Sequence, residues 1–369
     1  MIMDWKEELR NNIRNTEEII DYIDLSPNQT KQLDKLLLRY PMSIPRYYLS
    51  LIDRKDKNDP IKKMCIPTIN EFTHDGSFDT SGESLNTVIT GLQHKYDETA
   101  LILSTNQCAM YCRHCFRKRL VGVPEDETIE DFNEIINYIK EHEEISNVLI
   151  SGGDSLLNSN KKIENLLDGF SQIDHLDYIR LGTRVPVVFP DRIIKDKELL
   201  QILKRYNSKK QIYIVTQFNH PNEITDKSSE SVKCFLNLGI PVRNQTVLLK
   251  GINDSSRVLG KLLKDLTSIG VIPYYVFQCR PVKGVKNHFQ VPLKKGIAIV
   301  EKAKNMQNGQ GKSFRYCMSH ISGKIEILGL IDDNTILFKH HQAKNKTDKG
   351  KIFTKFINDH QSWLDDINI

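Results

Sequence analysis

Apolar and polar positions follow one rhythm from about residue 99 to residue 306, where short apolar runs alternate with longer amphipathic runs. Six short runs are apolar on both faces, as buried parallel strands are. They are residues 100–104, 147–151, 178–182, 211–216, 242–249 and 271–277. Six further runs carry apolar residues at helical spacing. They are residues 128–141, 162–170, 197–206, 230–238, 256–266 and 295–306. Strand–helix units in this order predict an α/β fold, a partial (βα)6 barrel with right-handed crossovers.

The two ends of the chain do not show this alternation of short apolar and longer amphipathic runs. Residues 4–23 carry a helical apolar pattern, and Ser26 followed by Pro27 is a good start for a helix that ends before Pro41. We expect a helical N-terminal module over residues 1–90, the barrel over 91–330 and a C-terminal extension over 331–369. Residues 344–355 are rich in lysine and loop-like, and residues 353–369 are a candidate docking helix.

Composition narrows the class of protein. Of 369 residues, 39% are hydrophobic and 27% are charged, which is typical of a soluble globular protein rather than a disordered one. The net charge of +5 is mild and its basic residues do not gather, so we expect no nucleic-acid partner. No apolar stretch is long enough to span a membrane, and the N-terminal residues lack the apolar centre of a secretory signal. We therefore expect a cytoplasmic protein.

Three of the seven cysteines lie within eight residues, in the pattern C-x3-C-x2-C formed by Cys108, Cys112 and Cys115. Three thiolates in one loop can bind three irons of a four-iron cluster and leave the fourth iron open. A structural zinc ion would need a fourth ligand, and His114 is poorly placed because it directly precedes Cys115. The pattern favours the iron–sulfur cluster, with zinc or a purely structural role as the alternatives.

This cysteine pattern after a first barrel strand resembles the signature of radical S-adenosylmethionine enzymes. The turn from Ser151 to Asp154 resembles the site where that superfamily binds the methionine amino group. Further segments are similar to the lysine 2,3-aminomutase family, and the likeness covers about residues 90–330. These segments are residues 111–117, 151–157, 182–186, 218–223 and 244–249.

The resemblance implies an isomerase that moves an amino group from the α to the β carbon of an amino acid. It implies a [4Fe-4S] cluster, S-adenosylmethionine and pyridoxal 5'-phosphate as cofactors. It also implies an electron donor of the flavodoxin or ferredoxin type and a homo-oligomer. The residues that it assigns to S-adenosylmethionine are His114, Gly152, Gly153, Asp154 and Gln245.

The resemblance also assigns the pyridoxal phosphate site. Lys324, directly after the turn at Ser322 and Gly323, matches the catalytic lysine that bonds to this cofactor, although the glycine run before it is shorter than in the family. Lys95 and Tyr96 match phosphate-binding residues in kind. Thr99, however, stands where a second arginine is often found, so we expect a differently built phosphate site.

The substrate residues depart from the lysine enzymes. Arg117 matches the arginine that binds the substrate α-carboxylate. The two aspartates that hold the lysine ammonium are replaced by Arg280 and Cys317, and Gln217 replaces a histidine. Arg280 with Lys283 suits an anionic substrate such as glutamate rather than free lysine. If Arg280 points away, His320 or Arg315 could take its place.

Two alternative functions stay open from the sequence. One is a radical enzyme on the same scaffold that does not use pyridoxal phosphate, suggested by the altered phosphate and glycine-rich segments. The other is a non-catalytic regulator that binds a metal or a cluster.

Overall fold

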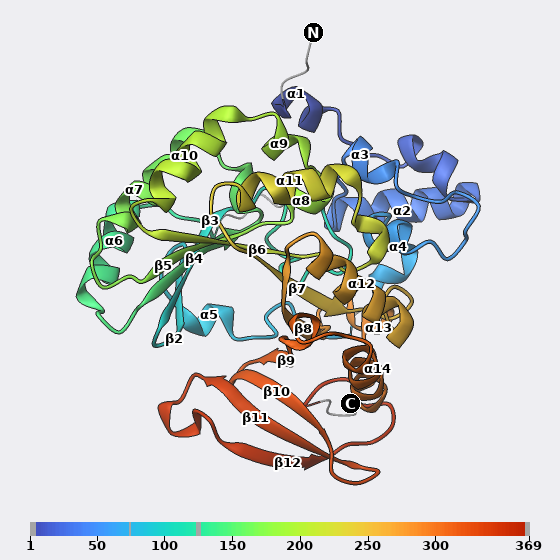
Figure 1. Ribbon diagram of the computed structural model, residues 1–369. Helices are drawn as coiled ribbons and strands as arrows, with labels where there is room; N and C mark the ends of the chain where they lie inside the picture. The colour runs from blue at the N-terminus through green and yellow to red at the C-terminus, as the bar shows by residue number, and fades with distance from the viewer. Residues whose placement is uncertain (1–4, 74, 123–126, 366–369) are drawn as a thin grey trace.

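One continuous sheet organises the part of the chain that the computed structural model describes, which is residues 5–73, 75–122 and 127–365 (Figure 1). The strands within these residues follow one another in sequence order, and those from β3 to β9 are parallel. The six predicted strands are confirmed. They are β3 (Thr99–Thr105), β4 (Asn147–Gly152), β5 (Tyr178–Gly182), β6 (Gln211–Thr216), β7 (Val242–Leu248) and β8 (Ile272–Gln278).

The inner face of these strands carries polar as well as apolar residues and is only half-buried in places, so the sequence-based expectation of two buried faces is wrong there. In β5, Ile179 and Leu181 are fully buried, whereas Tyr178, Arg180 and Gly182 are only half-buried. β7 shows the same alternation of buried and half-buried positions. An open, partial barrel leaves space inside, so polar side chains on the inner face line a cavity rather than a packed core.

Helices cover the outer face of the parallel strands (Figure 1). Each buries an apolar stripe against the sheet, as the sequence pattern predicts. Several begin at side-chain caps, such as Asp131 before α6 and Ser159 before α7. They are α6 (Phe132–Glu141), α7 (Asn160–Ser171), α10 (Lys197–Asn207), α11 (Asp226–Leu236), α12 (Ser256–Ser268) and α14 (Leu293–Asn305), with short α8 (Val185–Val188), α9 (Asp191–Ile194) and α13 (Lys286–Phe289).

The N-terminal module is built from short helices. Ser26 caps α2 in a reciprocal bond pair with Gln29, and Pro27 is its first residue, as predicted. Its helices are α1 (Trp5–Arg10), α2 (Pro27–Arg39), α3 (Arg46–Leu49), α4 (Pro60–Cys65) and α5 (Glu83–Asn86), with turns η1 (Glu17–Tyr22) and η2 (Ile69–Phe72). Two unpredicted strands, β1 (Thr87–Ile89) and β2 (Leu92–Tyr96), join it to β3 by antiparallel pairing.

The C-terminal region continues the sheet with antiparallel strands. They are β9 (Arg315–His320), β10 (Gly323–Leu330), β11 (Thr335–Ala343) and β12 (Ile352–Phe356). The expectation of a docking helix over 353–369 is wrong for the described residues. Residues 352–356 pair with β11, and residues 357–365 form turns and irregular backbone. Residues 366–369 lie outside the described part. None of the described helices has the length and apolar character needed to cross a membrane.

Candidate active site

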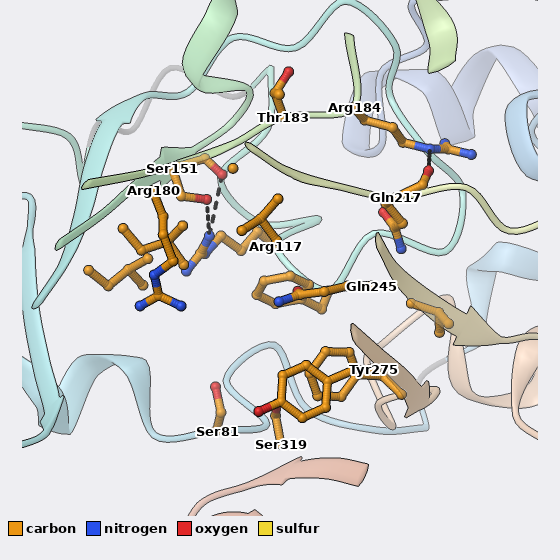
Figure 2. Close-up of a pocket in the computed structure, with 18 of the residues that line it drawn as sticks. Ser81, Arg117, Ser151, Arg180, Thr183, Arg184, Gln217, Gln245, Tyr275 and Ser319 are labelled. Carbon is orange, nitrogen blue, oxygen red and sulfur yellow. Dashed lines mark hydrogen bonds between the residues drawn. The ribbon is translucent and has the colours of Figure 1, made fainter. Parts of the chain in front are cut away.

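A cavity of about 650 Å³ occupies the inside of the partial barrel. Most of the residues that the sequence assigned to a cofactor or substrate role line this cavity. They are Lys95, Tyr96, Cys108, Cys112, His114, Cys115, Arg117, Gly152, Gly153, Asp154, Gln245, Arg280 and Lys324. Figure 2 shows Arg180, Gln245 and Tyr275, which come from β5, β7 and β8, together with Arg117 from the loop after β3. Residues more than 200 positions apart in the chain, such as Lys95 and Lys324, therefore share one wall.

The cysteines lie in the loop that follows β3, which we call the cysteine loop (residues 106–122). The glycine turn after β4 packs directly against the start of this loop. A Cβ atom on Gly152 would lie 2.3 Å from the carbonyl oxygen of Thr105, and one on Gly153 would lie 2.2 Å from that of Gln107. Gly152 also has φ +109°, a conformation that favours glycine. The two glycines therefore allow close approach of the turn to the cysteine loop.

The donor set fits an iron–sulfur cluster better than a single metal ion. In residues 5–73, 75–122 and 127–365, no three His, Cys, Asp or Glu side chains are grouped closely enough to hold a metal ion. A single zinc ion needs four converging ligands, whereas each iron of a cluster binds its own thiolate, so the thiolates lie farther apart. His114 is buried, its Nε2 lies 3.2 Å from Asn219 Nδ2, and its Nδ1 has no partner. Burial lowers the pKa of His114, so its ring is neutral.

Arg184 connects the third barrel strand to the cysteine loop. Its Nη1 donates to Cys112 Sγ at 2.7 Å, and its Nη2 lies 2.5 Å from Glu223 Oε1. Tyr48 donates its hydroxyl to the same carboxylate oxygen at 2.7 Å. The guanidinium therefore places positive charge beside one of the three cysteine sulfurs. In the sequence, Arg184 lies in the family-like segment 182–186 but was assigned no role.

Asp154 lines the cavity, and its carboxylate oxygens accept hydrogen bonds from neighbouring residues. It accepts hydrogen bonds from Thr183 Oγ1 at 2.6 Å and from the backbone N–H groups of Leu156, Arg184 and Val185 at 3.1, 2.6 and 3.2 Å. Asp154 thus fixes the turn that carries Arg184. The sequence assigned it to S-adenosylmethionine, and the geometry supports a positioning role.

A buried ionic group attaches the cysteine loop to the N-terminal module. Glu71 Oε2 lies 2.6 Å from Arg113 Nη2 and 2.5 Å from Lys118 Nζ, and all three side chains are at most 6% exposed. Burial alone would raise the pKa of Glu71, but the two cations lower it to about 2. The sequence did not identify this group, because its members come from separate elements.

The predicted substrate arginines lie together at one side of the cavity. Arg117 Nε donates to Glu83 Oε1 at 3.1 Å, and its Nη1 lies 3.4 Å from Ser151 Oγ (Figure 2). Arg280 Nη1 donates to Ser81 Oγ at 2.8 Å, and its guanidinium lies 4.0 Å from the centre of the Phe116 ring. Arg280 therefore faces the cavity.

The other substrate candidates do not line the described cavity. Lys283 lies over the Phe78 ring, at 5.3 Å from its centre. His320 Nε2 pairs with Asp365 at 2.5 Å, and Arg315 is exposed. Cys317 is buried within β9. Arg280 thus lines the cavity, whereas Lys283, His320 and Arg315 lie outside it.

Lys324 presents its amine to the cavity from β10. Its Nζ donates to Gln342 Oε1 at 2.9 Å and lies 4.6 Å from the centre of the Tyr275 ring. Burial lowers the pKa of Lys324 to about 8, which brings its neutral, nucleophilic form into reach near neutral pH. A Cβ atom on Gly323 would lie 2.2 Å from the carbonyl oxygen of Gln342, so glycine allows β10 and β11 to approach closely there.

Lys95 lies near the Tyr96 ring, as Lys324 does, at 5.7 and 5.9 Å from its centre, but its amine has other partners. Its Nζ donates to the carbonyl oxygens of Ser81 at 2.9 Å and His320 at 2.6 Å. Burial, followed by the charge of Arg280, lowers the pKa of Lys95 to about 7. Burial has the opposite effect on the neighbouring Tyr96: it raises the pKa of the phenol, which therefore stays protonated.

Comparisons with known proteins agree with this geometry. The radical SAM superfamily model matches residues 102–259. The chain is 40% identical to L-lysine 2,3-aminomutase of Acetoanaerobium sticklandii over 83% of this chain and 73% of that protein. It is 38% identical to L-lysine 2,3-aminomutase of Clostridium subterminale over 83% and 73% of the two chains. It is also 38% identical to glutamate 2,3-aminomutase of Clostridioides difficile over 83% and 72%. With its cysteine loop, glycine turn and shared cavity, the chain belongs to the lysine 2,3-aminomutase family of radical SAM enzymes.

Proposed function

We propose that this aminomutase uses pyridoxal phosphate and acts on an acidic amino acid such as glutamate rather than on free lysine. The observation that carries the proposal is the charge of the cavity, which holds Arg280 and offers no free carboxylate. The likeness to relatives does not decide the substrate, because lysine and glutamate enzymes are similar to this chain to the same degree.

Each described carboxylate that lines the cavity already has partners. Glu83 is shared by Arg117 and Arg119, at 3.1 and 2.9 Å. Glu98 pairs with Lys349. Asp154 accepts the four hydrogen bonds described above. A lysine ammonium would therefore enter the cavity without a carboxylate to compensate its charge.

Arg280 adds a direct penalty for a cationic substrate. Two like charges about 4 Å apart repel by about 4 kcal/mol at an effective dielectric of about 20. That energy corresponds to roughly a thousandfold in binding. A carboxylate at the same place would instead gain a charge-assisted hydrogen bond from the guanidinium.

The cluster and S-adenosylmethionine need specific binding residues, and the cavity wall offers candidates for both. When bound, the cluster with S-adenosylmethionine supplies a carbon radical for hydrogen-atom removal, and pyridoxal phosphate supplies an electron sink. We assign Cys108, Cys112 and Cys115 to the cluster. The wall formed by His114, Gly152, Gly153, Asp154 and Gln245 is assigned to S-adenosylmethionine, with Asp154 acting through the turn that it fixes.

The remaining side chains position the substrate. Lys324 holds an amine of lowered pKa beside the Tyr275 ring and facing the cavity, where the amine can bond to a carbonyl carbon. Arg117 is held by Glu83 and points to the cavity, so it can bind the α-carboxylate. Arg280 then binds the side-chain carboxylate. Radical SAM enzymes need a reductant, and we propose a flavodoxin or ferredoxin for this role and a homo-oligomeric assembly.

The test is turnover by reduced, reconstituted enzyme with S-adenosylmethionine and either glutamate or lysine, measured as β-amino product and 5'-deoxyadenosine. We expect product from glutamate and little from lysine. Arg280→Gln should lower glutamate turnover, whereas Lys283→Gln is the matched control, because Lys283 is a nearby cation outside the cavity. Efficient turnover of lysine by the unmodified enzyme would refute the proposed substrate.

A further inference from the structure

Arg180 is a cation of the cavity wall with no role so far. It lies on the inner face of β5, and its guanidinium points into the cavity (Figure 2). Its Nη2 lies 2.5 Å from Asn147 Oδ1, and its buried Nε has no hydrogen-bond partner. The titratable groups that act on it are Tyr178, Tyr274, Tyr275 and Arg243, and none is a carboxylate. Its charge is therefore uncompensated within the described residues.

The neighbouring cations of the wall differ from Arg180 in this respect. Arg117 pairs with Glu83, and Arg184 pairs with Glu223. Lys95 donates to two backbone carbonyl oxygens. A guanidinium keeps its charge at all ordinary pH values, and an unpaired buried charge is unfavourable. A bound anion would remove this imbalance.

The place of Arg180 separates it from the cysteine loop. It precedes Gly182, the last residue of β5, by two positions, which is about 7 Å along a strand. Its partner Asn147 begins β4 and lies opposite Thr99 in the sheet register. Lys324 is within electrostatic reach of Arg180, because the positive charge of Arg180 contributes to the lowered pKa of that lysine. An anion held by Arg180 would thus lie near the Lys324 amine and away from the cysteines.

We propose that Arg180 binds the phosphate group of pyridoxal phosphate, an inference that rests on the proposed use of this cofactor. Thr99 stands where the family resemblance places an arginine, and Asn147 links that position to Arg180. Arg180 can supply the planar pair of donors that a phosphate monoester accepts. Lys95, whose amine already holds the backbone of Ser81 and His320, then contributes less to phosphate binding than the sequence suggested.

The test compares pyridoxal phosphate with pyridoxal, which lacks the phosphate. Both are bound to the reconstituted protein, and covalent attachment is measured by borohydride trapping and peptide mapping. Arg180→Gln should weaken pyridoxal phosphate binding by about 10- to 100-fold and leave pyridoxal binding unchanged. Inorganic phosphate should compete with pyridoxal phosphate in the unmodified protein and lose this effect in the variant. Arg180→Lys should recover part of the affinity.

Arg243→Gln is the matched control. Arg243 also has a buried Nε without a partner, and its guanidinium lies over the Tyr213 and Tyr274 rings, but it does not line the described cavity. This variant should bind pyridoxal phosphate like the unmodified protein. Iron content reports that each variant is folded.

Unchanged affinity of Arg180→Gln for pyridoxal phosphate would overturn the inference alone. An equal loss for pyridoxal phosphate and pyridoxal would also overturn it, because the phosphate would not be the group recognised. Failure of the unmodified protein to bind pyridoxal phosphate would overturn the proposed cofactor together with this inference.

Discussion

Removing the charge of Glu71 should release the N-terminal module from the cysteine loop. Glu71→Gln keeps the shape of the side chain but leaves Arg113 and Lys118 buried without their carboxylate. Loss of one member of a buried ionic group costs about 3–5 kcal/mol. The lowered pKa of Glu71, about 2 against an ordinary value of 4.5, corresponds to about 3 kcal/mol, which agrees.

The sign of the pH dependence follows from the same shift. Because the folded protein lowers the pKa of Glu71, its stabilisation is complete above about pH 4.5 and is lost as the pH falls towards about 2. The difference in stability between the unmodified protein and Glu71→Gln should therefore be largest at pH 7 and shrink below about pH 4.

The assay is urea unfolding of the whole protein followed by circular dichroism. Glu18→Gln is the control, because Glu18 pairs with Arg46 at 3.4 Å on an exposed surface and should change stability by less than about 1 kcal/mol. A free energy of unfolding for Glu71→Gln within about 1 kcal/mol of the unmodified value would refute the reasoning, and would mean that water or a neighbour compensates the two cations.

Three further changes test the site. Serine at Cys108, Cys112 or Cys115 should abolish the cluster, because each iron needs its thiolate, and iron and sulfide analysis checks this. Lys324→Ala should no longer trap pyridoxal phosphate with borohydride but should keep its iron. In the unmodified protein, the amount of trapped cofactor should rise with pH through about 8, where the Lys324 amine loses its proton. Gly152→Ala should cost about 1–3 kcal/mol in unfolding and lower iron content, because its Cβ would meet the Thr105 carbonyl oxygen.

The sequence predicted the six parallel strands because each is a short apolar run between turn residues, a local signal. It failed for 352–356, a short run that directly follows lysine-rich, loop-like residues and that pairs with β11. Likewise, β1 and β2 are short and partly polar, and only their position beside β3 makes them strands.

The sequence could also place many candidate residues together, because residues that follow parallel strands meet at one edge of the sheet. The spacing of residues along the sequence does not predict which charged side chains form ion pairs. Glu71 lies 42 residues before Arg113, and Glu223 lies 39 residues after Arg184, so neither ion pair has a local pattern. Asp154 is a related case: the motif suggested a contact with S-adenosylmethionine, and the structure adds hydrogen bonds to Thr183 and Arg184 that no local pattern predicts.

The charges of the cavity also restrict how a ligand can lie in it. Arg180 and Arg280 are the described wall arginines without an ion-paired carboxylate, and both contribute to the lowered pKa of Lys324. A cofactor bonded to Lys324 with its phosphate at Arg180 would leave Arg280 for a substrate anion. Reversing the molecule would bring the phosphate to Arg280 and towards Glu83, whose negative charge acts on Arg280. Repulsion between the phosphate and Glu83 would disfavour that reversed orientation.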